Sequence, residues 1–276
     1  ELSKLEINID ILTGSKKSKK RKTLLEELEE GKINLLIGTH ALLEDTVKFN
    51  NLGFVVIDEQ HRFGVAQRAK LWKKNLNPPH VLVMTATPIP RTLSMTLYGD
   101  LDVSIIDELP PGRKEIKTLW RSDSSRLKII RFMHEQIKLG RQIYIVFPLI
   151  DESAKLDYKN LIEGFDSIVR EFPLPDFQVS VVHGQMKADD KEYEMQRFVE
   201  GKTDILVATT VIEVGVNVPN ASVMIIESAE RFGLSQLHQL RGRVGRGGNQ
   251  SYCVLMSGNK ISNDGKTRLQ TMIDTN

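Results

Sequence analysis

The segment Phe54-Val55-Val56-Ile57-Asp58-Glu59 most constrains how this chain can fold, because an apolar run leads directly into two adjacent carboxylates. A continuous run of β-branched and aromatic residues is typical of a strand buried on both faces of a parallel α/β sheet. Such a strand delivers the residues after it to the carboxyl edge of the sheet, where α/β proteins bind ligands. Two neighbouring carboxylates repel each other and favour a bound cation, although a solvated strand end is the plainer explanation of a bare Asp-Glu pair.

The composition is that of a globular protein, with 40% hydrophobic and 27% charged residues in a chain of 276, long enough for two domains. The net charge of +2 provides no strong global field, so a polyanion would have to be held by local patches. A single cysteine, Cys253, excludes an internal disulfide framework and a Cys-rich metal site, and it fits a reducing compartment. No membrane-spanning stretch or signal peptide is evident, which predicts a cytoplasmic protein without a membrane partner.

Two predicted strands near the start of the chain, at 7–12 and 33–37, end in short loops of small polar residues. These loop residues are Thr13, Gly14 and Ser15 after the first strand, and Gly38, Thr39 and His40 after the second. Hydroxyls and bare backbone suit contact with a sugar-phosphate backbone. The basic run at 16–22 precedes an acidic helix predicted at 23–30, and it is either a solvated surface or a phosphate-contacting loop.

A third strand, predicted at 80–84, leads into Thr85-Ala86-Thr87-Pro88. Prolines at 88 and 90 exclude a helix interior and stiffen the turn. Because Thr85 and Thr87 alternate with Ala86, both hydroxyls can face the neighbouring strand end that carries Asp58 and Glu59. The segment is therefore either a relay between a nucleotide pocket and a second ligand or a plain Pro-capped turn.

A polar, Pro/Gly-rich segment at 107–114 is typical of a hinge, and the alternation of strands and helices restarts after it. Strands are predicted at 116–120, 142–147, 178–182, 204–208 and 222–227, and helices at 124–139, 187–200 and 235–240, with at least one more helix between 148 and 175. Repeated strand–helix units on both sides of one hinge indicate two α/β lobes. We place them at 1–112 and 113–276.

Three arginines, Arg241, Arg243 and Arg246, lie among glycines directly after the last predicted helix. Crowded guanidinium groups without nearby acids are unfavourable unless an anion is present, and the guanidinium fork matches phosphate oxygens. The arrangement predicts an arginine finger, which one lobe supplies to a nucleotide held by the other. A generic basic loop is the plainer alternative.

In chain order, these segments resemble motifs II, III, V and VI of superfamily 2 helicases. They are Asp58-Glu59-Gln60-His61, Thr85-Ala86-Thr87, Ala208-Thr209-Thr210 through Gly215, and Gln239 through Arg246. The longer strings DEQHRFGVAQ, TATPIPRTL and IESAERFGLSQLHQLRGRVGRG are similar to the RecG family of bacterial ATP-dependent DNA helicases, which processes forks and junctions. The resemblance implies two RecA-like lobes with mainly parallel sheets, the P-loop NTPase helicase core, of which the first lobe is incomplete. It also implies that residues 268–276 begin the helical translocation arm that follows the second lobe in this family.

The resemblance also implies a role for each matching residue. Asp58 would hold Mg²⁺, Glu59 would activate the attacking water, and Arg243 and Arg246 would stabilise charge on the γ-phosphate. Residues implied in ATP binding or in coupling hydrolysis to DNA are Gln60, His61, Thr85, Thr87, Gly215, Asn217 and Gln239. Residues implied in DNA binding are Thr13, Gly14, Ser15, Gly38, Thr39, His40, His183, Gly184, Thr209 and Thr210.

The chain departs from the family pattern at two places. Motif V usually has Asp where this sequence has Asn217, and an amide keeps one acceptor but loses the charge. No Gly-x-x-x-x-Gly-Lys-Ser/Thr is present, so we expect the phosphate-binding loop to lie upstream of Glu1. We therefore expect the 276-residue chain by itself neither to bind ATP tightly nor to hydrolyse it, and ATPase activity above background would contradict this expectation.

The implied ligands are ATP, Mg²⁺ and branched DNA, with single-strand DNA-binding protein as a possible further partner. A monomer in the bacterial cytoplasm, associated with the nucleoid, is expected. Two alternatives stay open: a translocase like the transcription-repair coupling factor, and a non-hydrolysing DNA-binding scaffold on a helicase fold. Gln60-His61 and the string at 106–113 favour the RecG family over the coupling factor. The presence of both acids with Arg243 and Arg246 disfavours the scaffold.

Overall fold

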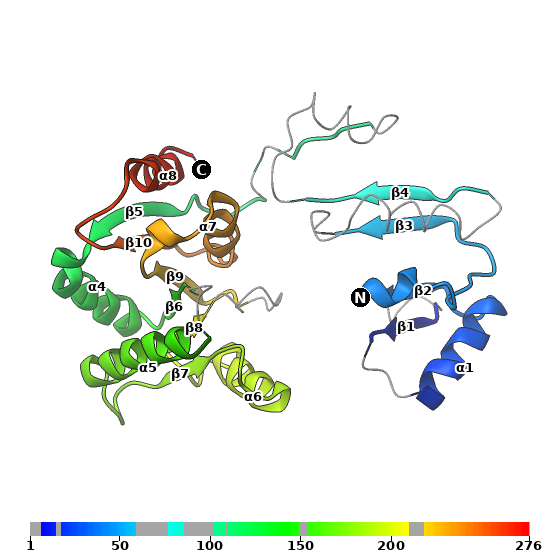
Figure 1. The fold of residues 1–276 in the computed structure, drawn as a ribbon, viewed down its shortest axis with the longest axis horizontal. Helices are drawn as coiled ribbons and strands as arrows, with labels where there is room; N and C mark the ends of the chain where they lie inside the picture. The colour runs from blue at the N-terminus through cyan, green and yellow to red at the C-terminus, as the bar shows by residue number, and fades with distance from the viewer. Residues whose placement is uncertain are drawn as a thin grey trace. The chain divides into compact units, whose positions relative to one another are not determined.

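The structure, a computed structural model, describes residues 7–14, 18–58, 77–85, 102–106, 108, 110–148, 154–209 and 218–275. Its contacts divide the chain into two compact units, Glu1–Val103 and Ser104–Asn276, whose elements are labelled in Figure 1. Every strand pair in the described ranges is parallel. This confirms the predicted α/β class with mainly parallel sheets.

In the first unit, the strands form two parallel pairs. Strand β1 (Ile9–Leu12) pairs with β2 (Leu35–Gly38), and β3 (Phe54–Ile57) pairs with β4 (His80–Val83). Helix α1 (Ser18–Glu29) connects β1 to β2, and the short helix η2 (His40–Leu43) follows β2. The core beneath β1 and β2 is built from the buried side chains Leu12, Leu24, Leu28, Ala41 and Val47.

The basic run is helical from Ser18 onward, so the predicted phosphate-contacting loop is wrong for residues 18–22. The basic residues lie in the first turns of α1, and Arg21 forms an ion pair with Glu44. A basic first turn and an acidic last turn oppose the preference of the helix dipole. The helix is held instead by its apolar face, on which Leu24 is 2% exposed.

Strand β3 is covered on one face, whereas the sequence predicted two buried faces. Ile57 is 5% exposed, but Phe54 and Val56 are 60% and 51% exposed. Among the described residues, Ile57 packs with Leu43 of η2, and the partly buried Val55 and Val81 pack against them. Because successive side chains of a strand alternate between faces, the covered face carries Ile57 and the open face carries Phe54 and Val56.

The second unit is a six-stranded parallel sheet with the strand order β5-β10-β9-β6-β8-β7. The strands are β5 (Lys117–Ser122), β6 (Gln142–Phe147), β7 (Val179–Val182), β8 (Ile205–Thr209), β9 (Ala221–Ile226) and β10 (Tyr252–Ser257). The helices are α4 (Arg126–Lys138), α5 (Ala154–Glu171), α6 (Ala188–Val199), α7 (Leu234–Arg241) and α8 (Asn263–Asp274), with the short helices η4 (Asp123–Ser125) and η6 (Ala229–Arg231).

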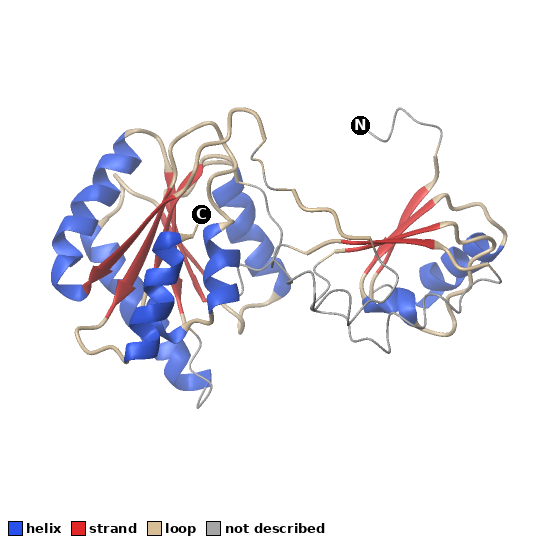
Figure 2. Cartoon of the chain, turned by 90° about the horizontal axis from the view of Figure 1, so that it is seen from above, coloured by secondary structure: helices blue, strands red, loops and turns tan. Residues whose placement is uncertain are grey.

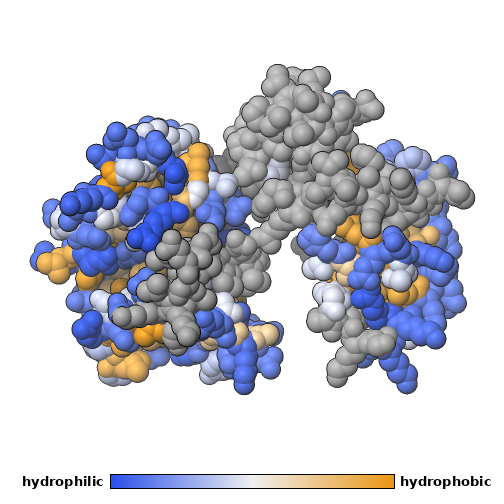
Figure 3. Space-filling model, in the orientation of Figure 1, coloured by the Kyte–Doolittle hydropathy of each residue, from blue (hydrophilic) through white to orange (hydrophobic). Residues whose placement is uncertain are grey.

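Helices cover both faces of this sheet (Figure 2). One face packs against α6, α7 and α8, and the other packs against α4 and α5. The four interior strands β10, β9, β6 and β8 are buried nearly throughout. The outer surface in the view of Figure 3 is mostly hydrophilic where the second unit is described. None of the helices in the described ranges is long and apolar enough to cross a membrane.

Two elements of the second unit were missed or misplaced by the sequence analysis. Strand β10 was not predicted, although it lies inside the sheet between β5 and β9. Its signal is the short apolar run from Cys253 to Met256, which follows the glycine-rich arginine segment closely. Helix α8 begins at Asn263, earlier than the helical arm predicted at 268–276. Ser262 caps it, because its Oγ accepts a hydrogen bond from the Gly265 N–H at 3.1 Å.

Cys253 provides a test of this core. Burial within the sheet raises the pKa of its thiol from the ordinary 9.0 to about 12. We expect the folded protein to resist thiol labelling at pH 8 and to react once it is unfolded in guanidinium, as read by mass spectrometry of the peptide that contains Cys253. Because the pKa of the Cys253 thiol is higher in the folded protein, burial of the neutral thiol contributes fully to the free energy of unfolding below pH 9. This contribution is lost as the pH rises towards 12. Rapid labelling of the folded protein would contradict this burial.

Candidate functional site

Strands β3 and β4 bring two predicted site residues to the same sheet edge. Ile57 lies opposite Val83 in the parallel register, and the Met84 N–H donates to the Ile57 carbonyl at 2.8 Å. Asp58 follows β3 directly and Thr85 follows Met84, so both leave the carboxyl edge of this pair. A carboxylate and a threonine hydroxyl are both hard oxygen ligands of the kind that suits Mg²⁺.

The pair β1–β2 places two predicted DNA-binding loops together. Leu12 lies opposite Gly38, so the loop that begins with Thr13 and Gly14 starts beside the loop of Thr39 and His40. In the second unit, Val182 lies opposite Ala208, which brings His183 and Gly184 to the same edge as Thr209. Predicted residues outside the described ranges are Ser15, Glu59, Gln60, His61, Thr87, Thr210, Gly215 and Asn217.

The surroundings of His183 favour its neutral form. Partial burial lowers the pKa of His183, and the positive charge of Lys191 lowers it further. Lys191 lies close by because its Nζ donates to the Gly184 carbonyl at 2.9 Å. A neutral imidazole, a lysine and exposed backbone at one strand end can donate hydrogen bonds to a polar backbone such as that of DNA.

Helix α7 carries Gln239 and ends at Arg241, whose side chain stabilises the fold. Arg241 is 7% exposed, and its Nη1 donates to the Met272 carbonyl at 3.0 Å and to the carbonyl of Thr275. These carbonyls belong to the C-terminal end of α8, where a cation is favourable. The expectation that three arginines form one anion-binding group is therefore wrong for Arg241.

Arg243 and Arg246 remain in the turn after α7. The pKa of Arg246 is lowered by partial burial and then by the positive charges of Arg243 and Arg113. Burial raises the pKa of Tyr144 in β6 to about 12, and the positive charges of Arg246 and Arg243 oppose this rise. Positive charge is thus concentrated near Tyr144 of β6, and an anion is the ligand that would relieve it.

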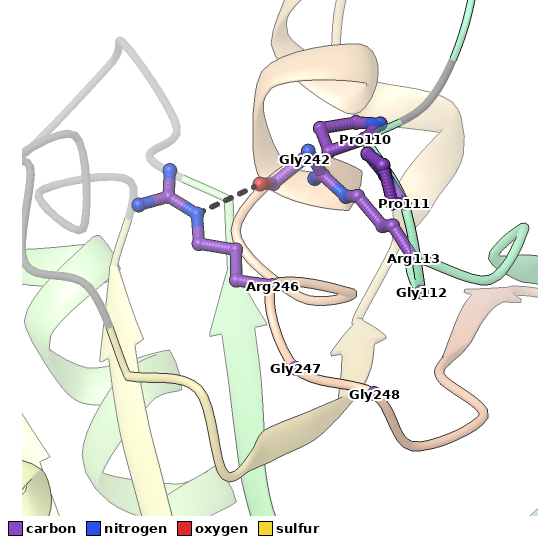
Figure 4. Close-up of a pocket in the computed structure, with 8 residues that line it drawn as sticks. All are labelled: Pro110, Pro111, Gly112, Arg113, Gly242, Arg246, Gly247 and Gly248. Atoms are coloured by element: carbon purple, nitrogen blue, oxygen red, sulfur yellow. Dashed lines mark hydrogen bonds between the residues drawn. The ribbon is translucent and has the colours of Figure 1, made fainter.

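A pocket of about 720 Å³ opens beside this turn, within the second unit. Its lining is drawn in Figure 4 and consists of Pro110, Pro111, Gly112, Arg113, Gly242, Arg246, Gly247 and Gly248. The Arg246 Nε–H donates to the Gly242 carbonyl at 3.4 Å, which bends the start of the side chain back over the turn. Arg113 was assigned no role from the sequence.

A half-buried ion pair at the sheet edge was also missed. Arg126 Nη1 and Nη2 donate to the two carboxylate oxygens of Glu227 at 2.9 and 2.8 Å, and Nη2 reaches Asp123 at 3.0 Å. Hydrogen bonding to Glu227 raises the pKa of Arg126. The partners are 101 residues apart, so no local pattern in the sequence could indicate the pair. Among the described residues, no group of three or more His, Cys, Asp or Glu is placed to hold a metal ion.

Comparison with known proteins identifies relatives of this chain. The DEAD/DEAH box helicase family matches residues 1–96, and the helicase conserved C-terminal domain matches residues 126–248. The ATP-dependent DNA helicase RecG of Synechocystis sp. is 54% identical over 268 residues, which cover 97% of this chain and 32% of that protein. The chain is similar to the RecG helicases over nearly its whole length. The Bacillus subtilis RecG helicase is 51% identical over 273 residues, covering 99% of this chain and 40% of that protein.

Solved structures agree with this similarity. A RecG structure bound to a three-way DNA junction has a TM-score of 0.74 and 42% identity, and the match covers 99% of this chain and 35% of that one. The Mycobacterium smegmatis helicase Lhr shares the fold, with a TM-score of 0.68 at 17% identity, over 96% of this chain and 37% of that one. This chain therefore spans about a third to two fifths of the length of the RecG relatives described above.

Proposed function

We propose that this chain is part of an ATP-dependent DNA helicase that remodels branched DNA, such as stalled forks and Holliday junctions, in recombination and repair. The observation that carries the proposal is the match to RecG bound to a three-way DNA junction, at 42% identity over 99% of this chain. The concentration of positive charge around Arg243 and Arg246 supports it, because a motor of this kind needs cations for a nucleotide phosphate.

The roles of the site residues are part of the proposal. Residues 1–112 serve as the C-terminal part of the first RecA-like lobe, and residues 113–276 serve as the second lobe with the start of the translocation arm. Asp58 would hold Mg²⁺, which would offset the charge of the phosphates when ATP is bound. Glu59 accepts the proton of the attacking water, and Arg243 and Arg246 stabilise the negative charge that develops on the γ-phosphate.

Coupling and DNA contact complete the mechanism. Thr85 lies beside Asp58 at one sheet edge, and with Thr87 it links the hydrolytic site to the DNA-binding loops. Gln60, His61, Gly215, Asn217 and Gln239 contribute to nucleotide binding. The strand-end residues proposed to contact the DNA backbone are Thr13, Gly14, Ser15, Gly38, Thr39, His40, His183, Gly184, Thr209 and Thr210. The protein acts as a monomer in the bacterial cytoplasm at the nucleoid, with single-strand DNA-binding protein as a partner.

The test uses the full-length protein and synthetic DNA. We expect ATP hydrolysis to be stimulated more by a three-way junction than by linear duplex of equal length, and the junction to be unwound in the presence of ATP. Unwinding without RNA polymerase distinguishes this function from that of a coupling factor. DNA binding without any ATP hydrolysis would support the scaffold alternative and overturn the proposal.

A further inference from the structure

Residues 110–116, here named the strap, run along the glycine-rich turn that carries Arg246. The Arg113 Nε–H donates to the Gly245 carbonyl at 2.7 Å, and the Gln250 side-chain amide donates to the Glu115 carbonyl at 2.8 Å. Immediately after the strap, the Lys117 N–H donates to the Ser251 carbonyl at 3.0 Å. The strap and the turn are thus joined along their length, although Arg113 and Gly245 are 132 residues apart in sequence.

The strap has a defined shape before it meets the turn. The Arg113 N–H donates to the Pro110 carbonyl at 3.1 Å, and Gly112 has a φ of 81°. Proline and then a glycine with positive φ at the two central positions are typical of a type II β-turn. Arg113 is therefore presented from a stiff turn, so little backbone freedom is lost when its side chain binds the Gly245 carbonyl.

Strap and turn are also in direct packing contact. Gly245 has a φ of 77°, and a Cβ atom at this position would lie 2.8 Å from Cγ1 of Ile116. Only glycine satisfies both the backbone conformation and the close approach of Ile116. The conformation of the turn therefore depends on the position of the strap.

The bond from Arg113 acts on the peptide unit next to Arg246. The Gly245 carbonyl belongs to the peptide bond that joins Gly245 to Arg246, so a hydrogen bond to it fixes the plane from which Arg246 departs. In Figure 4, the guanidinium groups of Arg113 and Arg246 point to different sides of the turn. The Arg113 side chain binds the backbone on one side of the turn, and the Arg246 side chain extends from the other side.

We propose that Arg113 is a positioning residue for the arginine finger, and that its bond to the Gly245–Arg246 peptide sets the direction in which Arg246 meets the transferred phosphate. This inference rests on the proposed function. Arg246 is proposed to act on charge that develops during hydrolysis, so misplacing it lowers kcat more than it weakens ATP binding.

The experiment uses the full-length protein with Arg113→Ala, Arg113→Lys and the control Arg170→Ala. Arg170 is an arginine of α5 that also donates to a main-chain carbonyl, that of Asp166 at 3.3 Å. For Arg113→Ala we expect kcat for DNA-stimulated ATP hydrolysis to fall by about 10- to 100-fold, the effect of a small misplacement of a catalytic group, with KM within about twofold of the parent. Arg113→Lys, which retains a donor, should recover part of the loss, and Arg170→Ala should match the parent.

A double substitution tests whether Arg113 acts through Arg246 or independently of it. If Arg113 acts through Arg246, adding Arg113→Ala to an Arg246→Ala protein should lower kcat by less than about twofold more, because residues that act as a unit are not additive. The inference would be overturned if the kcat losses of the two single variants multiplied in the double variant. It would also be overturned if Arg113→Ala had the parental kcat, with or without a raised KM. Should Arg113→Ala fail to fold, Arg113→Lys takes its place in the cycle. An inactive parent protein would instead count against the proposed function.

Discussion

Replacing Arg246 with alanine in the full-length protein is expected to lower kcat for ATP hydrolysis by about 10³-fold, the lower range for loss of an arginine finger. Partial burial lowers the pKa of Arg246, and the like charges of Arg243 and Arg113 lower it further. Such crowding destabilises the protein without an anion, and binding of the transferred phosphate relieves it. KM for ATP should change much less, because the charge that Arg246 stabilises grows in the transition state.

The lysine variant of Arg246 supplies the control for charge. Arg246→Lys keeps the positive charge but loses the planar fork, so its kcat should lie between those of the parent and of Arg246→Ala. Circular dichroism and the melting temperature should show that both variants fold, since the hydrogen bond from Arg246 to the Gly242 carbonyl is long at 3.4 Å. A kcat for Arg246→Ala within threefold of the parent would remove Arg246 from the catalytic machinery.

Much of the architecture could be predicted from local sequence patterns. The apolar run at 142–147 is strand β6, and the periodic apolar positions at 124–139 form η4 and α4. These predictions succeed because a buried parallel strand and an amphipathic helix each leave a signal within a few residues. Strand β10 was missed because its apolar run is short and adjoins a segment whose glycines and arginines indicated a loop.

The site was predictable in its residue types but not in its geometry. Spacing alone put Arg241, Arg243 and Arg246 in one group, whereas the last turn of α7 directs Arg241 to the carbonyls that end α8. The bond between Arg113 and Gly245 joins positions 132 residues apart, so it depends entirely on tertiary packing. Which arginine of a cluster faces the ligand is decided by the elements behind it, and these are set by the whole fold.

Replacing Glu59 with glutamine in the full-length protein is expected to lower the rate of ATP hydrolysis by about 10²- to 10⁴-fold, the usual contribution of a general base. Glu59 lies outside the described residues, but Asp58 before it leaves β3 at the edge shared with Thr85. The amide has nearly the same shape as the carboxylate and cannot accept a proton from water, so ATP and DNA should still bind.

The measurement for Glu59→Gln is single-turnover hydrolysis together with equilibrium binding of a fluorescent ATP analogue. Glu26→Gln is the matched control, because Glu26 lies on the exposed surface of α1 and pairs with Lys22 at 3.8 Å. It should hydrolyse ATP at the parental rate. Because Asp58 is proposed to hold the cation and Glu59 to act on water, Asp58→Asn should also raise the Mg²⁺ concentration needed for half-maximal activity, and Glu59→Gln should not. If both substitutions shifted the Mg²⁺ requirement equally, the two carboxylates would share one role, and the assignment of Glu59 as the base would be wrong.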